Sequence, residues 1–188
     1  VQYVDAQVGR LVERLGLLGL SESTLVILTP DHGEGLGDHG VLQHGENPFD
    51  ELVRIPLIVR GPGVPAGGHR VGTAQLEDLF PTVLAFLDLA VPDGVDGFDL
   101  LPWLSGSATE SPRKVALGRM RSFGSRTSPH FAEAWPKKWI GIPGQPRRSC
   151  ALDTDAAEVD GKAADGARAA LTAALEAAEE SGAEEPVR

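Results

Sequence analysis

Histidines and carboxylates gather in one short stretch, 31–44, of this 188-residue chain. An adjacent aspartate and histidine, as at Asp31 and His32, offer one hard oxygen and one imidazole nitrogen to a divalent cation. Metal sites use about four to seven donors, so this pair predicts part of a site whose other ligands lie elsewhere. The alternative is a Gly-rich turn in which Asp31 caps a helix and the histidines face solvent. The stretch also contains Glu34, Asp38, His39 and His44.

The elements before this stretch predict an α/β fold. Apolar residues recur at spacings of three and four over 3–20, which is typical of an amphipathic helix. The run at 24–29 is β-branched and lacks polar alternation, so we expect a strand covered on both faces. Residues 30–47 then lack periodicity and are expected to form a loop. Ligands of open α/β sheets bind at the carboxyl ends of strands, which is where this loop begins.

Further elements follow along the chain. The run at 54–59 predicts a second short buried strand, and residues 79–89 predict a helix that begins near Pro81. Segments 115–121 and 137–142 are candidate strands of a small sheet, and the Ala- and Glu-rich stretch 166–180 predicts a last helix. We expect two units, a core lobe at 1–112 and a small subdomain at 113–188.

Charge is distributed in blocks along the chain. The formal net charge is −10, but residues 1–112 carry −11, residues 113–150 carry +8 and residues 151–188 carry −7. The acidic total argues against nucleic acid as a partner, although basic residues interleaved with aromatics, as in 113–150, can bind it. We favour a basic wall facing a small anion, or a solvated sheet face. No apolar run approaches the roughly 18 residues of a membrane span.

Several motifs, in one order along residues 1–106, resemble the sulfatase family of the alkaline phosphatase superfamily. They are TPDHGEGLGDHG at 29–40, RIPLIVRGPG at 54–63, DLFPTVL at 78–84 and DGFDLLPWL at 96–104. The resemblance implies the C-terminal half of the catalytic domain: part of an alkaline-phosphatase-like mixed sheet flanked by helices. It also implies a small C-terminal antiparallel sheet and a terminal helix.

The resemblance also implies roles for individual residues. Asp31 and His32 match the family's later pair of metal ligands, for a cation that is usually calcium and in some members magnesium or manganese. A histidine in place of the commoner asparagine is similar to the phosphonate monoester hydrolases, and it shifts the expectation toward manganese or iron. His44 stands where the family has a lysine that contacts the sulfate or phosphate, and a protonated imidazole can donate a hydrogen bond there. Asp38 and His39 match a pair expected to order the loop from outside the metal ligands.

The family's nucleophile is a formylglycine made from a cysteine or serine followed by Pro/Ala and Arg. Cys150 is the one cysteine, it lacks that context, and it is not the nucleophile. The chain opens at Val1 directly before a helix, so we expect an N-terminal part that carries the nucleophile, and an isolated chain without turnover. Arg54 is expected to form a structural ion pair with Glu51.

The expected function is therefore metal-dependent hydrolysis of small anionic sulfate esters. One alternative is a phosphodiesterase or phosphonate monoester hydrolase with the same metal loop. Another is a non-catalytic remnant that binds anionic partners through the basic block 113–148.

Overall fold

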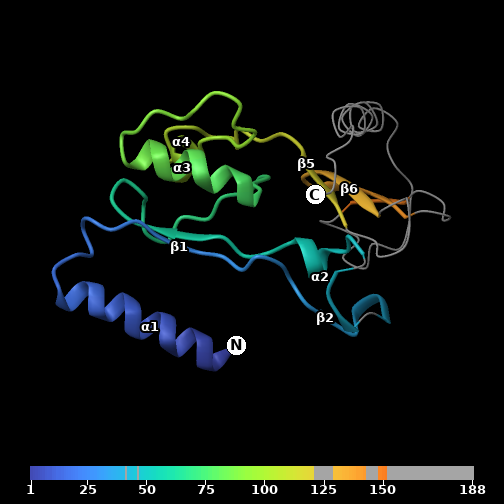
Figure 1. The fold of residues 1–188 in the computed structure, drawn as a ribbon, viewed down its shortest axis with the longest axis horizontal. Coiled ribbons are helices and arrows are strands. Elements are labelled where there is room, and N and C mark those ends of the chain that lie inside the picture. The colour runs from blue at the N-terminus through green and yellow to red at the C-terminus, as the bar shows by residue number, and fades with distance from the viewer. Residues whose placement is uncertain (41, 46, 121–128, 143–147, 152–188) are drawn as a thin grey trace, which may run out of the picture.

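The structure is a computed structural model, and it describes residues 1–40, 42–45, 47–120, 129–142 and 148–151. In Figure 1, strand β1 (Val26–Leu28) runs between helix α1 (Gln2–Leu17) on one side and helices α3 (Leu79–Phe86) and α4 (Leu101–Ser105) on the other. Strand β1 pairs antiparallel with β4 (Ile58–Arg60), with Ile27 opposite Val59. The helices predicted at 3–20 and 79–89 are confirmed as α1 and α3. None of the described helices has both the length and the apolar character needed to cross a membrane.

The expectation that the strands at 24–29 and 54–59 are buried is wrong for the described structure. Leu28 is 39% exposed and Ile58 57% exposed. An apolar run of this kind suits a strand inside a larger sheet with both faces covered. Here β1 and β4 form a sheet of two strands among the described residues, so their faces remain in contact with solvent.

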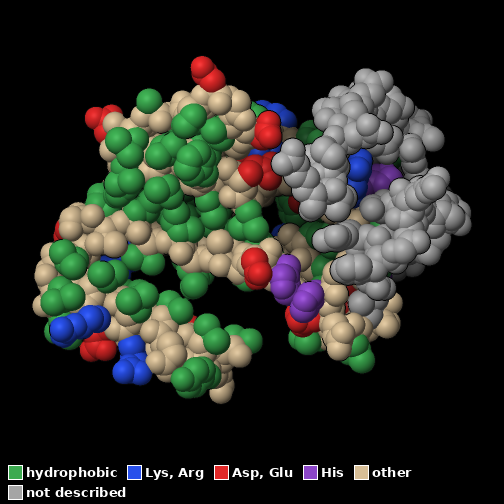
Figure 2. All heavy atoms as spheres, in the orientation of Figure 1, with side chains coloured by type: hydrophobic (Ala, Val, Ile, Leu, Met, Phe, Trp, Pro, Cys, Tyr) green, Lys and Arg blue, Asp and Glu red, His purple; other side chains and the backbone are tan. Residues whose placement is uncertain are grey.

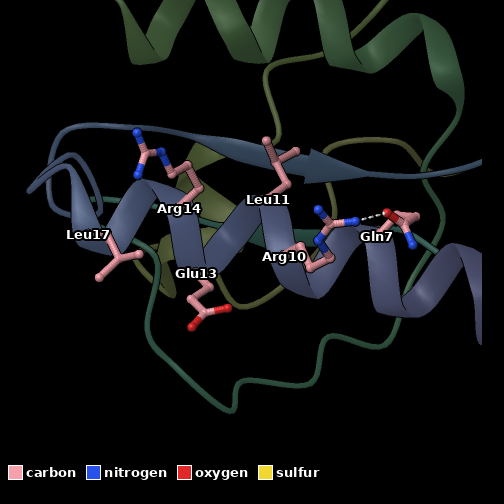
Figure 3. Close-up of a pocket in the computed structure, with 6 residues that line it drawn as sticks. All are labelled: Gln7, Arg10, Leu11, Glu13, Arg14 and Leu17. Carbon is pink, nitrogen blue, oxygen red and sulfur yellow. Dashed lines mark hydrogen bonds between the residues drawn. The ribbon is translucent and has the colours of Figure 1, made fainter.

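Helix α1 also leaves much of its apolar stripe exposed. Its spacing of apolar residues is helical as predicted, yet no residue of α1 is buried among the described residues. An open groove of about 450 Å³ lies along this helix (Figure 3), and the Arg10 guanidinium donates to Gln7 Oε1 at 2.8 Å beside it. The groove is lined by Gln7, Arg10, Leu11, Glu13, Arg14 and Leu17. It lies on α1, so the predicted site residues of the stretch 31–44 do not line it.

A buried ion pair joins the 3-10 turn η2 (Leu76–Asp78) to the segment that leads into the C-terminal sheet. The Arg113 guanidinium donates to both carboxylate oxygens of Asp78, at 2.7 and 2.6 Å. Asp78 also accepts the backbone N–H of Gln75 and of Phe98, each at 2.8 Å. Burial lowers the pKa of Arg113, but its bonds to Asp78 and Glu77 outweigh burial and leave that pKa raised.

The C-terminal sheet has four antiparallel strands in the order β5-β6-β7-β8. Its strands are β5 (Ala116–Arg119), β6 (His130–Ala134), β7 (Lys137–Gly141) and β8 (Arg148–Ala151). The strands predicted at 115–121 and 137–142 are confirmed, whereas β6 and β8 were not predicted. The sequence of β6, HFAEA, holds Ala and Glu, which are depleted in strands, so its local signal is weak. The helix predicted at 166–180 lies outside the described residues.

Three cations of the basic block 113–150 pair with carboxylates in the part of the chain that the structure describes. Arg113 pairs with Asp78, and Lys138 in β7 is fully buried and pairs with Asp50 of α2 (Asp50–Val53). Lys114 pairs with Glu110 on the surface at 2.7 Å. These three cations neutralise carboxylates of this chain. The expectation of a basic wall is therefore wrong for Arg113 and Lys138, because a buried charge requires a partner within the fold.

Candidate metal and anion site

Asp31 and His32 follow the end of strand β1 and lie on the surface, with side chains 89% and 44% exposed. His32 Nδ1 lies 2.7 Å from the carbonyl oxygen of Gly33. A carbonyl can only accept, so Nδ1 carries the proton of this contact, and the lone pair of a neutral imidazole is left on Nε2. His32 Nε2 lies 3.8 Å from Asp31 Oδ2. His32 Nε2 and the Asp31 carboxylate oxygen are therefore neighbours.

This arrangement fits two ligands of a divalent cation. A metal-binding histidine characteristically donates its other ring N–H to a backbone carbonyl or carboxylate, as His32 does to Gly33. The described residues contain no group of three or more His, Cys, Asp or Glu side chains that could hold a metal ion. Any cation bound by Asp31 and His32 would therefore need further ligands beyond those that the described residues bring together.

His44 lies against His32. The ring centroids are 4.1 Å apart and the ring planes are inclined by 32°. His44 Nδ1 lies 3.1 Å from Glu34 Oε2, across the hairpin of β2 (Gly35–Leu36) and β3 (Leu42–Gln43). The carboxylate accepts, so His44 Nδ1 carries a proton and Nε2 is the nitrogen left to contact a further group. Glu34, for which the sequence indicated no role, orients this imidazole.

Helix α2 contacts the loop through residues that are more buried than Asp31 and His32. His39 Nδ1 lies 3.0 Å from Glu51 Oε1, with the two side chains 17% and 14% exposed, and the His39 ring stacks on Phe49 at 4.0 Å. The backbone N–H of Gly33 donates to the carbonyl of Leu52 at 2.8 Å. His39 thus lies where the sequence analysis expects a residue that orders the loop. Figure 2 shows histidine side chains grouped beside acidic ones on the face turned toward the viewer.

Arg54 pairs with a different partner from the one expected. Its guanidinium lies 3.7 Å from Asp50 Oδ2, one helical turn earlier, and its Cζ lies 4.5 Å from the ring centroid of Trp135. Glu51 bonds His39. The expected pair of Arg54 with Glu51 is wrong. Asp50 is four residues before Arg54, a spacing that brings side chains together on a helix, and Glu51 is already bonded to His39.

A substitution at Gly33 tests how closely α2 approaches the loop. An added Cβ would lie 2.0 Å from the carbonyl oxygen of Glu51, which is backbone and cannot rotate away. We expect Gly33→Ala to lower the free energy of unfolding by about 1–3 kcal/mol, as overpacking does. Gly9→Ala in α1 is the control, because an added Cβ meets nothing there within 4 Å and alanine favours helix. Urea unfolding measures both, and equal shifts in the two variants would contradict the close approach.

Comparison with known proteins agrees with the motifs. A family model for sulfatases matches residues 1–89. The chain is 28% identical over 122 residues to an ulvan-active sulfatase of Formosa agariphila, and 31% identical over 115 residues to a choline-sulfatase of Rhizobium meliloti. The chain is thus similar to sulfatases in both comparisons. This confirms the resemblance predicted from the sequence, and sulfatases generally depend on a divalent cation.

Solved structures of related proteins match more of the chain. BT4656, solved in complex with its substrate D-glucosamine-2-N,6-O-disulfate, superposes with a TM-score of 0.80 and 26% identity over 94% of this chain and 38% of that chain. A phosphonate monoester hydrolase of Agrobacterium radiobacter superposes with a TM-score of 0.72 and 30% identity over 95% of this chain and 38% of that chain. The predicted alkaline-phosphatase-like α/β fold with a small C-terminal antiparallel sheet is confirmed.

The region matched is a limited part of each relative. The alignments cover 63% and 60% of this chain, but 24% of the ulvan-active sulfatase and 22% of the choline-sulfatase. The sequence motifs singled out Asp31, His32, His39 and His44 as candidates, but they did not indicate the residues that contact the loop from elsewhere in the chain. Glu51, Phe49 and Lys138 lie outside the motif, and their partners are distant along the chain, so no local pattern marks them.

Proposed function

We propose that the complete gene product hydrolyses sulfate esters, and that this chain supplies two ligands of its divalent cation and one contact to the anion. The proposal assigns the ligands to Asp31 and His32 and the anion contact to His44. The observation that supports it best is the meeting of these three side chains at one surface. His32 Nε2 lies 3.8 Å from Asp31 Oδ2, and the rings of His32 and His44 are 4.1 Å apart.

A divalent cation held there would supply Lewis-acid stabilisation of charge on the sulfate oxygens. The residues of this chain do the positioning. The Gly33 carbonyl holds the tautomer of His32, and Glu34 holds the ring of His44 with Nε2 turned away from the carboxylate. When the imidazole is charged, Nε2–H donates a hydrogen bond to an anionic oxygen of the substrate. In the proposed mechanism the nucleophile is a formylglycine, and the motif that would carry it does not occur in this sequence.

We propose calcium as the first candidate for the cation, with manganese, magnesium and iron as alternatives. The carboxylate of Asp31 suits all four ions, and the imidazole of His32 suits manganese and iron better than calcium. The proposed substrate is a small anionic sulfate ester. BT4656 was solved with a disulfated glucosamine, and this supports a sulfated ligand for the same fold.

Phosphoryl chemistry is the second candidate. It is favoured by the 30% identity to a phosphonate monoester hydrolase over 95% of this chain. The complete gene product should be assayed with aryl sulfates, phosphonate monoesters and phosphodiesters, each with calcium, manganese, magnesium or iron added. Faster hydrolysis of the sulfate supports the proposal, and faster hydrolysis of the phosphorus esters supports the alternative. No hydrolysis of any ester with any of these ions would reject both.

Substitution of His44 tests the anion contact. We expect His44→Ala to lower kcat/KM for the aryl sulfate by about 10²–10³-fold, as loss of a donor to developing negative charge does. His44→Lys should retain more activity than alanine, because an ammonium also donates to an anion. His69→Ala is the control, since His69 lies exposed outside the loop. Unchanged kcat/KM in His44→Ala would contradict the assignment.

A further inference from the structure

The C-terminal sheet contacts helix α2 at two points. Lys138 Nζ lies 2.5 Å from Asp50 Oδ1 and 5.5 Å from the ring centroid of Phe131. Trp135, at the turn between β6 and β7, lies against the Arg54 guanidinium. The two contacts are made to Asp50, the first residue of α2, and to Arg54, the residue after its end. In Figure 1, α2 lies between β2 and the sheet that holds β5 and β6.

The same helix contacts the loop of the candidate site at two points. Glu51 bonds His39, and the carbonyl of Leu52 accepts from the amide of Gly33, which directly follows His32. Helix α2 has four residues, and a helix of one turn has almost no stability of its own. The position of the loop therefore depends on what holds α2 in place.

The pair of Lys138 and Asp50 is suited to that task. Lys138 is fully buried and the Asp50 side chain is 20% exposed. A buried ammonium is stable only while its partners are in hydrogen-bonding positions, so displacement of Asp50 from it is costly. The pair joins two segments that are 88 residues apart in sequence.

We propose that Lys138 is a positioning residue, which through Asp50 and α2 fixes the loop that carries Asp31 and His32. The assignment of that loop as the metal site rests on the proposed function. The mechanical link from β7 to the loop does not depend on it, and can be measured without cation or substrate.

The test is site-resolved hydrogen exchange of two amides in the complete gene product. The Gly33 amide reports on the loop. The Leu104 amide of α4, which donates to the carbonyl of Leu100 just before that helix, reports on a region outside the link. We expect Lys138→Met to accelerate exchange at Gly33 by at least roughly tenfold with Leu104 unchanged, since local opening differs between regions of one fold. Lys114→Met is the matched control, because it removes a cation of the same block from an exposed pair.

Each outcome decides the proposal. Unchanged exchange at Gly33, or equal acceleration at Gly33 and Leu104, would overturn it, because the second result indicates a general loss of stability. If Lys138→Met does not fold, Trp135→Leu is used, and it should accelerate Gly33 alone by a smaller factor. Titration of the native protein with calcium or manganese then separates the two proposals. If the protein binds neither ion, the metal site is rejected. The exchange experiment still tests the link between Lys138 and the loop.

Discussion

Replacement of Arg113 by methionine should lower the free energy of unfolding by about 3–5 kcal/mol, the usual cost of removing one partner of a buried ion pair. Asp78 is fully buried, and its two oxygens accept from the Arg113 guanidinium. Methionine keeps an unbranched apolar stem and carries no charge, so Asp78 would keep its backbone donors and lose its counter-ion. Urea unfolding of the complete gene product, followed by tryptophan fluorescence, measures the loss.

Two further variants separate the ion pair from general effects of the substitution. Arg119→Met removes an exposed arginine at the end of β5, and should change the free energy of unfolding by less than about 0.5 kcal/mol. Asp78→Asn combined with Arg113→Met removes both charges and keeps one oxygen, which can accept from the amide of either Gln75 or Phe98. The double variant should recover part of the loss. A loss in Arg113→Met no larger than in Arg119→Met would show that the pair contributes nothing.

Replacement of Asp31 by alanine should have the largest effect on the proposed activity. Loss of a residue that only orients a metal ligand costs about 10–100-fold in metal affinity. A carboxylate that binds the cation directly contributes more to that affinity. We therefore expect more than roughly 100-fold weaker binding of calcium or manganese by calorimetry. Hydrolysis of an aryl sulfate should fall by at least about 10²–10³-fold, the cost of one lost electrostatic contact in an active site.

Asp93→Ala is the matched control for Asp31→Ala. Asp93 is an exposed aspartate in a turn that precedes α4, so its removal changes the net charge equally without touching the loop. Asp31 itself is 89% exposed, and its substitution should leave unfolding by urea unchanged. Equal cation affinity in the Asp31→Ala and Asp93→Ala proteins would contradict the assignment of Asp31 as a ligand.

Features of the fold that depend on neighbouring residues could be predicted from the sequence. The spacing of apolar residues predicted α1 and α3. The residue types and spacing in 31–44 predicted a candidate site in the loop after β1. The motifs, taken in order, also predicted the resemblance to sulfatases and the fold, and the comparisons confirm both. The roles of Asp31, His32 and His44 stay predictions.

The remainder depends on contacts between distant residues. His39 meets Glu51 twelve residues later, and Lys138 meets Asp50 after 88 residues. The sequence does not indicate which distant residue a charged side chain will contact. Arg113 and Lys138 were therefore predicted to belong to a basic surface. Burial of β1 and β4 was overestimated for a related reason, since exposure depends on which elements cover a strand.

The three tryptophans of the chain occupy three different settings. Trp103 is buried in α4 and Trp139 is buried in β7, whereas Trp135 is partly exposed and stacks on Arg54. The emission of an indole shifts to longer wavelength as water reaches it. A protein that keeps Trp135 and carries phenylalanine at the other two positions would thus contain an optical probe at the junction of the C-terminal sheet and α2. Its emission could follow that junction in real time during stopped-flow mixing.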